Sequence, residues 1–439
     1  MNVREISAKH TYGTWRKQRG FNPLHIVSAE GCYFTDSSGK RYLDFSSQLM
    51  CSNLGHGNRA VIDAIKSQAE ELPFIAPGYT TTARAELAEE LLTVLPKGLT
   101  KFFFATSGTE ANEAAIKVAR LYTGKHKIIS RYASYHGSTA GSVSHTGDFR
   151  RWLVEGHSTV PGAVFAPDCN CYRCPFNKKP DDCSTECVEY IEYMLEREGN
   201  VAAVLVEPIV GTNGVLVPPK TYLPRLREIT KKHGVLLIAD EVMSGWGRAG
   251  SWFAVDHDGV VPDILTTAKG ITGAYVPLGL MATTGEVAEY FDDHFFAHGH
   301  TYESHPLMLK PATAAIREYK RLGLIERSKT MGEVLGQKLR GLAEKHPSVG
   351  DVRGRGMFWG VELVRDRQTR VPFGTAQEKL DGKPLLIDQV TAKMASLGVT
   401  CTGWISHLVI APPLILSEAE LDEGIAALDE ALAIADAAL

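Results

Sequence analysis

One lysine of this sequence follows an apolar run of strand length. Lys269 comes directly after Ile264 to Thr267 and an alanine, and it precedes Gly270. Lysines are usually solvated, so a surface charge is the ordinary interpretation of any single one. Burial after an apolar strand would disfavour the ammonium form and lower the pKa, which gives an amine suited to imine formation. The position of Lys269 therefore indicates covalent chemistry on a carbonyl group.

Two carboxylates also follow apolar runs. Asp240 ends the run that begins at Val235, and Glu207 ends the run that begins at Ala202. In α/β folds, ligands bind outside the carboxyl ends of the parallel strands. Each acid by itself could be an ordinary strand-end residue at the surface. Beside a reactive lysine, however, a carboxylate is suited to pair with a ring nitrogen.

A possible phosphate site lies in Phe104 to Glu113, which runs from a predicted strand through a turn into a helix. Ser107 and Glu110 have the spacing of a capping box, which marks the start of a helix. Free N–H groups and the helix dipole bind anions there, while Gly108 permits close approach and Thr109 adds a hydroxyl. Taken by itself, this segment is more simply interpreted as a capped helix that binds no ligand. The segment is not a GxGxxG fingerprint and does not support a dinucleotide site.

An aromatic residue completes the set. Tyr135 lies in Tyr135-His136-Gly137 after the predicted strand Lys127 to Arg131, where it could stack on a flat heterocycle or simply cover the core. A phosphate site, a stacking ring, a carboxylate and a lysine are together what pyridoxal phosphate (PLP) requires, because it forms a Schiff base with lysine and its ring nitrogen pairs with an aspartate. The combination predicts a PLP enzyme.

The composition bounds the class of protein. With 439 residues, 44% of them hydrophobic and 22% charged, the chain is expected to form at least two globular domains. The net charge of −4 argues against nucleic acid as a partner. No apolar run approaches the ~18 residues of a membrane span, and the first ten residues lack a signal-peptide pattern. We therefore expect a cytoplasmic protein without a membrane partner.

The elements that position these residues alternate between strands and helices. The runs above and Lys101 to Ala105 read as strands, whereas Glu110 to Arg120 and Tyr222 to His233 read as helices, the latter followed by Gly234 as a C-terminal cap. This alternation predicts an α/β fold with a mainly parallel sheet.

The two chain ends differ from the middle. Residues 21–60 have hairpin patterns, and the chain from about 330 onward mixes helices with a strand-like stretch. We expect a large domain at 60–325, with a Cys-rich insertion at 168–188. A small α+β domain is expected from 1–59 and 326–439.

The ordered set of motifs resembles the class-III (ω-type) aminotransferases, which are PLP enzymes of fold type I, over nearly the whole chain. The stretches that carry the resemblance are Tyr42-Leu43-Asp44-Phe45, Asn53-Leu54-Gly55-His56-Gly57, Ser107-Gly108-Thr109-Glu110-Ala111-Asn112-Glu113, Tyr135-His136-Gly137, Val206-Glu207-Pro208, Asp240-Glu241-Val242, Ala268-Lys269-Gly270, His300-Thr301-Tyr302 and Pro412-Pro413-Leu414. The resemblance implies a homodimer in which both subunits build each active site.

The resemblance also implies roles for individual residues. Lys269 would carry PLP as a Schiff base and move the substrate proton, and Asp240 would pair with the pyridinium nitrogen; Glu207 would lie near Asp240 and the substrate. The remaining cofactor contacts would come from the ring-flanking Tyr135 and Val242, the adjacent His136, the phosphate-binding Ser107, Gly108 and Thr109, and Thr301 of the partner subunit.

The substrate is less well determined. Many relatives carry a carboxylate-binding arginine before the Pro-Pro pair, but this chain has none there, and the corresponding position is Val409 or Thr402. Because a buried unpaired anion is costly, another cation is needed. Arg150 and Arg151 are the candidates, although a solvated loop arginine explains either equally well. Further pocket residues are expected to be Trp15, Leu49 and Met50.

The subgroup resemblance suggests a substrate class. Ser46-Ser47-Gln48-Leu49-Met50 and Cys171-Tyr172-Arg173-Cys174-Pro175 are similar to segments of taurine aminotransferases. This similarity implies an ω-amine donor with an anionic tail, taurine or β-alanine, and 2-oxoglutarate or pyruvate as acceptor, with ping-pong kinetics. An aminomutase, racemase or decarboxylase would share Lys269 and Asp240 and stays an alternative. A non-catalytic binding protein would have no reason to retain the complete set.

Five cysteines crowd into the insertion. Four of these thiolates could bind zinc, but the spacing is loose, and a loop of reduced thiols over the large domain is the simpler interpretation. We therefore expect no metal. The five are Cys169, Cys171, Cys174, Cys183 and Cys187.

Overall fold

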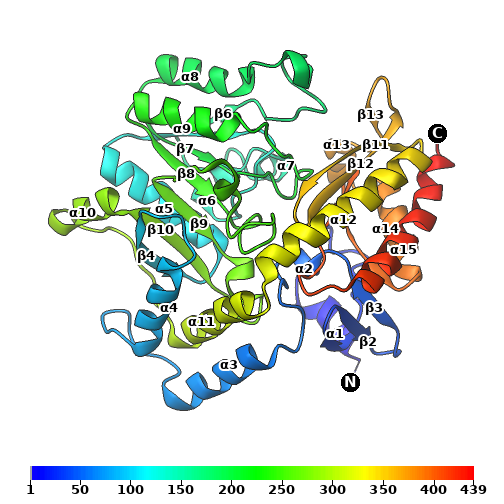
Figure 1. The fold of residues 1–439 in the computed structure, drawn as a ribbon, viewed down its shortest axis with the longest axis horizontal. Coiled ribbons are helices and arrows are strands. Elements are labelled where there is room, and N and C mark those ends of the chain that lie inside the picture. Colours follow the sequence, from blue (N-terminus) through cyan, green and yellow to red (C-terminus); the bar gives the residue numbers. More distant parts are fainter. Residues whose placement is uncertain (1) are drawn as a thin grey trace.

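A seven-stranded sheet forms the centre of the larger lobe (Figure 1). The computed structural model describes residues 2–439. The strand order is β4-β10-β9-β8-β7-β5-β6, and only β10 runs antiparallel to its neighbours. The prediction of a mainly parallel α/β sheet is therefore confirmed. The strands are β4 Leu99–Ala105, β5 Lys127–Arg131, β6 Ala163–Ala166, β7 Val201–Val206, β8 Leu236–Asp240, β9 Ile264–Thr267 and β10 Gly279–Thr284.

Helices cover both faces of this sheet, which is why β7 is buried along its whole length. Ala203 and Leu205 pack in the cluster that contains the alanine-rich face of α5, whereas Val204 and Val206 pack with α8 and α9. The helices of this lobe are α3 Arg59–Glu71, α4 Thr82–Leu92, α5 Gly108–Thr123, α6 Ala140–Ser144, α7 Phe149–Trp152, α8 Glu186–Glu198, α9 Tyr222–Lys232, α10 Gly285–Asp293 and α11 Pro306–Arg321, with the 3-10 turns η1 Pro180–Asp182, η2 Ala254–Asp258 and η3 Lys269–Thr272.

The two chain ends meet in a smaller lobe (Figure 1). Leu43 of β3 pairs in parallel with Val399 of β14, so the N-terminal hairpin and a C-terminal strand share one sheet. The strands here are β1 Ile26–Glu30, β2 Tyr33–Asp36, β3 Arg41–Asp44, β11 Val349–Arg355, β12 Phe358–Asp366, β13 Val371–Pro372, β14 Val399–Thr400, β15 Thr402–Trp404 and β16 His407–Ile410; the helices are α1 Val3–His10, α2 Ser47–Met50, α12 Leu324–Lys345, α13 Ala376–Asp381, α14 Leu386–Ser396 and α15 Glu418–Asp436. The domain boundaries at 59 and 325 stay a prediction.

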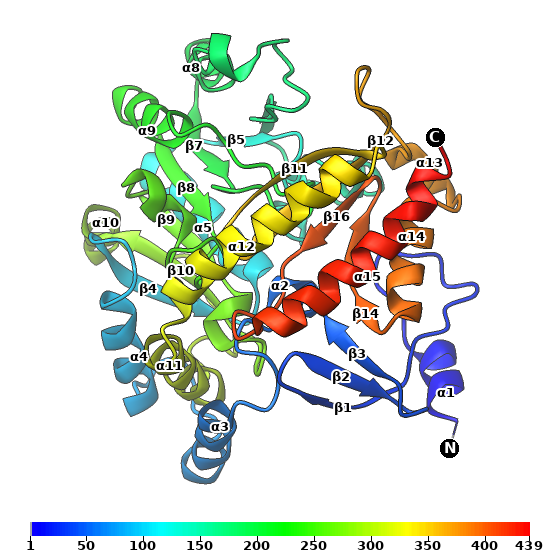
Figure 2. The ribbon, with the colours of Figure 1, turned by 45° about the vertical axis from the view of Figure 1, so that its right-hand side comes forward.

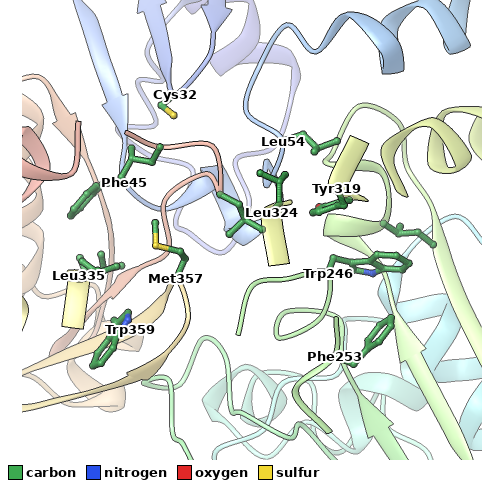
Figure 3. Packing of buried hydrophobic residues seen from close by; sticks show 14 of the residues in the cluster. Cys32, Phe45, Leu54, Trp246, Phe253, Tyr319, Leu324, Leu335, Met357 and Trp359 are labelled. Atoms are coloured by element: carbon green, nitrogen blue, oxygen red, sulfur yellow. The ribbon is translucent and has the colours of Figure 1, made fainter. Parts of the chain in front are cut away.

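One hydrophobic cluster continues from the large lobe into the small one. Helix α12 runs between the lobes in both ribbon views (Figures 1 and 2). Figure 3 shows one end of this cluster around Trp246 and Tyr319 and the other around Met357 and Trp359, with Leu324 between them. The shared core fixes the position of the small lobe against the sheet.

A fully buried arginine joins the lobes beside this core. The Nη1 atom of Arg248 donates to the carbonyl oxygens of Met357 (2.9 Å) and Pro412 (2.6 Å). Its Nη2 atom donates to Ser47 Oγ (2.9 Å) and Asn53 Oδ1 (2.6 Å). Residues from three distant parts of the chain are thus held around one guanidinium group.

No helix in the described part of the chain combines the length and hydrophobicity that a bilayer-spanning segment needs.

Glu241 gives this core a pH dependence. Burial raises its pKa from 4.5 to about 7, although Ser244 Oγ and the Val255 N–H donate to its carboxyl group. Between these pH values the folded protein retains a proton that the unfolded chain has lost, so the free energy of unfolding falls as pH rises. Glutamine does not titrate, so Glu241→Gln removes this fall in the free energy of unfolding, which amounts to roughly 3 kcal/mol at most. We expect the melting temperature of the variant, relative to that of the parent, to increase from pH 5 to pH 8. A pH-independent difference would contradict this expectation.

Candidate active site

The predicted site residues gather at one edge of the central sheet. Asp240 ends β8, Glu207 follows β7, and Lys269 lies two residues beyond β9. These three strands are adjacent and parallel, so their carboxyl ends meet at the same edge. The helix start at Ser107 follows β4 and reaches this edge as well. The arrangement is the ligand-binding geometry of an open α/β sheet.

Asp240 is buried and held by three donors. Its Oδ2 atom lies 2.7 Å from His136 Nδ1 and 2.8 Å from Asn112 Nδ2, and its Oδ1 atom accepts the N–H of Val242 (3.0 Å). The other ring nitrogen of His136 lies 3.1 Å from Ser130 Oγ. The carboxylate is therefore fixed in orientation before any ligand arrives.

Asn112 is a site residue that the sequence analysis missed. It lies on α5, and its Oδ1 atom accepts a hydrogen bond from Thr266 Oγ1 (2.6 Å) while its amide serves Asp240. The available signal was a polar residue on the alanine-rich face of a helix, since such a residue is buried only when it is hydrogen-bonded.

Lys269 has an unusual backbone and an unusual environment. Its φ of 51° lies in the left-handed region, where residues other than glycine are strained and which is frequent at functional sites. Burial lowers the pKa of its amine, although nearby Cys51, Asp240 and Glu207 act in the opposite direction. The lowered pKa increases the neutral fraction of the amine, as imine chemistry requires.

The start of α5 offers free backbone donors. Ser107 is the N-cap, and its hydroxyl accepts the N–H of Glu110 (3.4 Å), which leaves the N–H groups of Gly108 and Thr109 for a ligand. The predicted capping box is only half present, because the Glu110 carboxylate accepts from the N–H of Thr106 (2.8 Å) rather than from Ser107.

The Tyr135 loop lies against this helix start. Gly137 has a φ of 138°, and a side chain there would collide with Thr109 Oγ1, at 2.1 Å from an added Cβ. Glu207 holds the loop from the other side: its Oε1 atom accepts the N–H of Tyr135 (3.0 Å), and its Oε2 atom accepts the N–H of Gly211 (2.7 Å). Burial raises the pKa of Glu207, and nearby Asp240 adds to this effect.

The structure separates the two candidate arginines. Arg150 is buried, and its Nε atom donates to both carboxylate oxygens of Asp148 (2.9 and 3.1 Å). Its guanidinium carbon lies 3.7 Å from the ring centre of Tyr135, 4.8 Å from that of Trp404 and 5.6 Å from that of Trp15. Three aromatic rings thus surround this cation, an arrangement that favours it electrostatically. Arg150 and Trp15 line one cavity.

Arg151 turns away from the site. Its Nε atom donates to the carbonyl oxygen of Thr146 (3.1 Å), its Nη1 atom pairs with Glu155, and its guanidinium lies over Phe165.

The remaining predicted residues lie at the edge of the site. Leu49 is 63% exposed and is not among the residues that line the cavity of Arg150 in the described part of the chain. Met50 beside it is buried and has a positive φ of 55°. Thr301 is exposed between α10 and α11. Contact of Thr301 with a partner subunit stays a prediction.

The cysteine insertion docks on the small lobe. Arg173 Nε donates to Glu362 Oε1 of β12 (2.8 Å), and Cys169 Sγ lies 3.0 Å from Arg131 Nη1. Among residues 2–439, no three His, Cys, Asp or Glu side chains form a group that could hold a metal ion.

These side chains fit PLP. A helix start supplies donors for a phosphate, an oriented carboxylate lies at the sheet edge, and an amine with a lowered pKa follows the next strand. Val242 packs against Gly108 and Tyr135 lies on a separate loop, so two side chains are available for the faces of a ring.

Comparison with known proteins agrees with this chemistry. The model of the class-III aminotransferase family matches residues 15–432. The leucine/methionine racemase of Thermococcus litoralis is 37% identical over 94% of this chain and 91% of its own length. The taurine–pyruvate aminotransferase of Bilophila wadsworthia is 34% identical over 97% of this chain and 96% of its own. The structure of taurine:2-oxoglutarate aminotransferase from Bifidobacterium kashiwanohense, in complex with PLP and glutamate, has a TM-score of 0.95 and 37% identity, covering 99% and 98% of the two chains.

Fold and site together define a PLP-dependent transferase of fold type I. The chain belongs to the class-III aminotransferase family. The predicted family, enzyme class and cofactor are thereby confirmed, and an amine donor and a 2-oxo acid are the substrates of this reaction class. The roles of individual side chains stay predictions.

Proposed function

We propose that this aminotransferase acts on an ω-amine with an anionic tail, of the taurine or β-alanine type, and passes the amino group to 2-oxoglutarate or pyruvate. Two of the relatives described above bear taurine in their names, and the family resemblance covers the whole site. We also propose a homodimer in which Thr301 of the partner subunit completes the phosphate site.

When bound, PLP supplies an aldehyde for amine exchange and a ring that withdraws electrons. In this proposal, the amine of Lys269 would hold PLP and, once released, would accept and give back the proton of the substrate carbon. Asp240 keeps the ring nitrogen protonated, with His136 and Asn112 holding the carboxylate in place. Glu207 holds the backbone of Tyr135, whose ring would stack on the cofactor.

The proposal of an anionic substrate rests on the buried guanidinium of Arg150. The two positions where relatives carry an arginine, Thr402 and Val409, are paired across β15 and β16 and supply no charge. Burial lowers the pKa of neighbouring His407 to about 4, so this side chain is neutral near pH 7. Arg150 shares the loop and the aromatic surroundings of Tyr135. Its Nε and Nη2 atoms bind Asp148, which leaves its Nη1 side to donate to a carboxylate or sulfonate.

Replacing Arg150 tests this assignment. Arg150→Gln is expected to lower kcat/KM for taurine and β-alanine by about 10²-fold, because a buried charge-assisted pair is lost. Propylamine has a similar length and no anion, so its kcat/KM should change less than about threefold. Arg151→Gln is the matched control and should leave the preference for anionic amines intact. Equal losses on charged and neutral amines would contradict the assignment.

A donor panel at fixed acceptor tests the substrate class itself. We expect transfer from taurine and β-alanine to 2-oxoglutarate or pyruvate, measured as glutamate or alanine formed. Activity with α-amino acids only would overturn the proposal.

Racemisation is the second candidate, because a leucine/methionine racemase is among the most similar relatives. A racemase removes the proton from the substrate carbon and returns it to the opposite face of the same carbon, so the amino group stays in place and no acceptor is needed. Incubation with L-leucine or L-methionine without any 2-oxo acid would then yield the D-enantiomer. The proposed transaminase would form no D-enantiomer, and without an acceptor any amine could complete at most one half-reaction.

A further inference from the structure

A basic cavity, here called the mouth, lies beside Arg150, whose guanidinium packs on the ring of Tyr135. Its volume is about 900 Å³. One wall comes from the N-terminal segment 15–19, another from residues 379–388, and the inner wall from Phe149, Arg150 and Trp404. Lys17 Nζ donates to the carbonyl oxygen of Asp381 (2.8 Å), so the two outer walls are tied together although they are far apart in sequence. The fold therefore holds the walls of this cavity in place.

The charge of this cavity is opposite to that of the chain. The whole protein carries a net charge of −4, whereas the lining has one carboxylate, Asp388. Six cationic side chains line the cavity: Arg16, Lys17, Arg19, Arg150, Lys379 and Lys383.

Few of these cations are neutralised. Asp388 is 3.4 Å from Lys379, and Asp148 pairs with Arg150. Within residues 2–439, no ion pair joins a carboxylate to Arg16, Arg19 or Lys383, all of which are exposed to the cavity. Like charges gathered in a concave surface focus the potential and attract anions of higher charge most strongly.

The two substrates of the proposed reaction differ in charge. Taurine and β-alanine carry one anionic group, for which the single guanidinium of Arg150 suffices. A dicarboxylic 2-oxo acid carries two, and a second carboxylate beside a cluster of like-charged cations gains an attraction that a monocarboxylic acid lacks.

We propose that the cluster of Arg16, Arg19 and Lys383 attracts and holds the second carboxylate of the acceptor, so that the enzyme selects dicarboxylic over monocarboxylic 2-oxo acids. This inference rests on the proposed aminotransferase function but not on the identity of the amine donor. It narrows the acceptor to a dianion such as 2-oxoglutarate.

The second half-reaction tests the proposal independently of the donor. Holoenzyme in its amine form is mixed with 2-oxoglutarate or with 2-oxopentanoate, which has the same number of carbons and a single carboxylate. We expect kcat/KM for 2-oxoglutarate to exceed that for 2-oxopentanoate by at least about tenfold at low salt, and to fall more steeply as ionic strength rises. The double variant Arg19→Gln/Lys383→Gln should lose most of this ratio. Lys66→Gln/Lys97→Gln removes two exposed charges elsewhere and should keep it.

A binding measurement separates recognition from turnover. Glutarate and pentanoate do not react, so calorimetric titration into the holoenzyme reports recognition alone. The proposal is supported if the parent binds glutarate more tightly than pentanoate and the mouth variant binds the two acids equally. The proposal is overturned if the parent binds glutarate no more tightly than pentanoate, or if the mouth variant keeps the parent's ratio of kcat/KM for 2-oxoglutarate over 2-oxopentanoate. Either result holds even if taurine proves to be the donor. Failure of every amine in the donor panel would instead overturn the proposed donor class and leave the acceptor result standing.

Discussion

Lys269→Ala is expected to reduce transamination by at least about 10⁴-fold. In the proposed mechanism, this amine both attaches the cofactor and moves the substrate proton, and a positioned acid–base group alone contributes up to about 10⁴-fold. Turnover of the best amine of the donor panel, with excess PLP present, measures the loss. The fold should persist, because the phosphate donors and Asp240 are untouched.

Two controls make this result specific. Lys66→Ala removes an exposed lysine of α3 and should leave turnover unchanged. Added methylamine should restore part of the activity of Lys269→Ala, since a small free amine can act as the missing base. A Lys269→Ala enzyme within tenfold of the parent would show that this lysine is not the proton carrier.

Asp240→Asn is the second large effect, with an expected loss of about 10² to 10³-fold in kcat. An amide cannot hold a proton on the ring nitrogen as a carboxylate does, and the loss of one preorganised electrostatic partner typically has this magnitude. The neighbours of Asp240 also become mismatched. Asn112 donates to one carboxylate oxygen and the Val242 N–H to the other, so one of these donors would face the new NH2 group. Steady-state turnover at saturating amine measures the change.

Asp263 provides a matched control for this carboxylate. It precedes β9 at the opposite end of the sheet, where it pairs with Arg227 and accepts the N–H of Leu237 (2.7 Å). Asp263→Asn should lower thermal stability but leave kcat per folded enzyme within about threefold, since surface-side changes away from the site act on stability. Similar kcat losses in both variants would mean that Asp240 acts only through the fold.

The sequence predicts the sheet edge that carries the candidate site, because each strand that forms this edge can be recognised from its own residues. β5 and β9 begin and end at the predicted residues, and both strands are almost wholly buried between the helices on the two faces of the sheet. Glu207 follows β7 directly, Asp240 ends β8, and Lys269 lies two residues beyond β9. Their meeting at one edge then follows from parallel pairing alone.

What the sequence does not reveal depends on contacts between distant residues. Asn112 and Asp240 are 128 positions apart, and Lys17 and Asp381 are 364 apart. No local pattern specifies either contact. Arg150 and Arg151 are chemically identical neighbours, and only the direction of the short helix α7 decides which of them faces Tyr135. The basic mouth arises in the same way, from two segments that carry ordinary surface charges until the fold brings them together.

The substrate proposals divide the recognition of anions between two places. Arg150, inside the aromatic surroundings of Tyr135, Trp15 and Trp404, is assigned to the anion nearest the reacting carbon. The outer cations are assigned to the second charge of the acceptor. One enzyme could then accept a monoanionic amine and a dianionic oxo acid in turn without the arginine that many relatives carry before the Pro-Pro pair.

Borohydride reduction of the holoenzyme, followed by digestion and peptide mass mapping, tests the central claim most directly. Reduction converts the link between cofactor and amine into a stable bond. The added mass should appear on the peptide that contains Lys269 and on no other. A tag on a different lysine, or an untagged Lys269 in protein that retains its cofactor, would contradict the account.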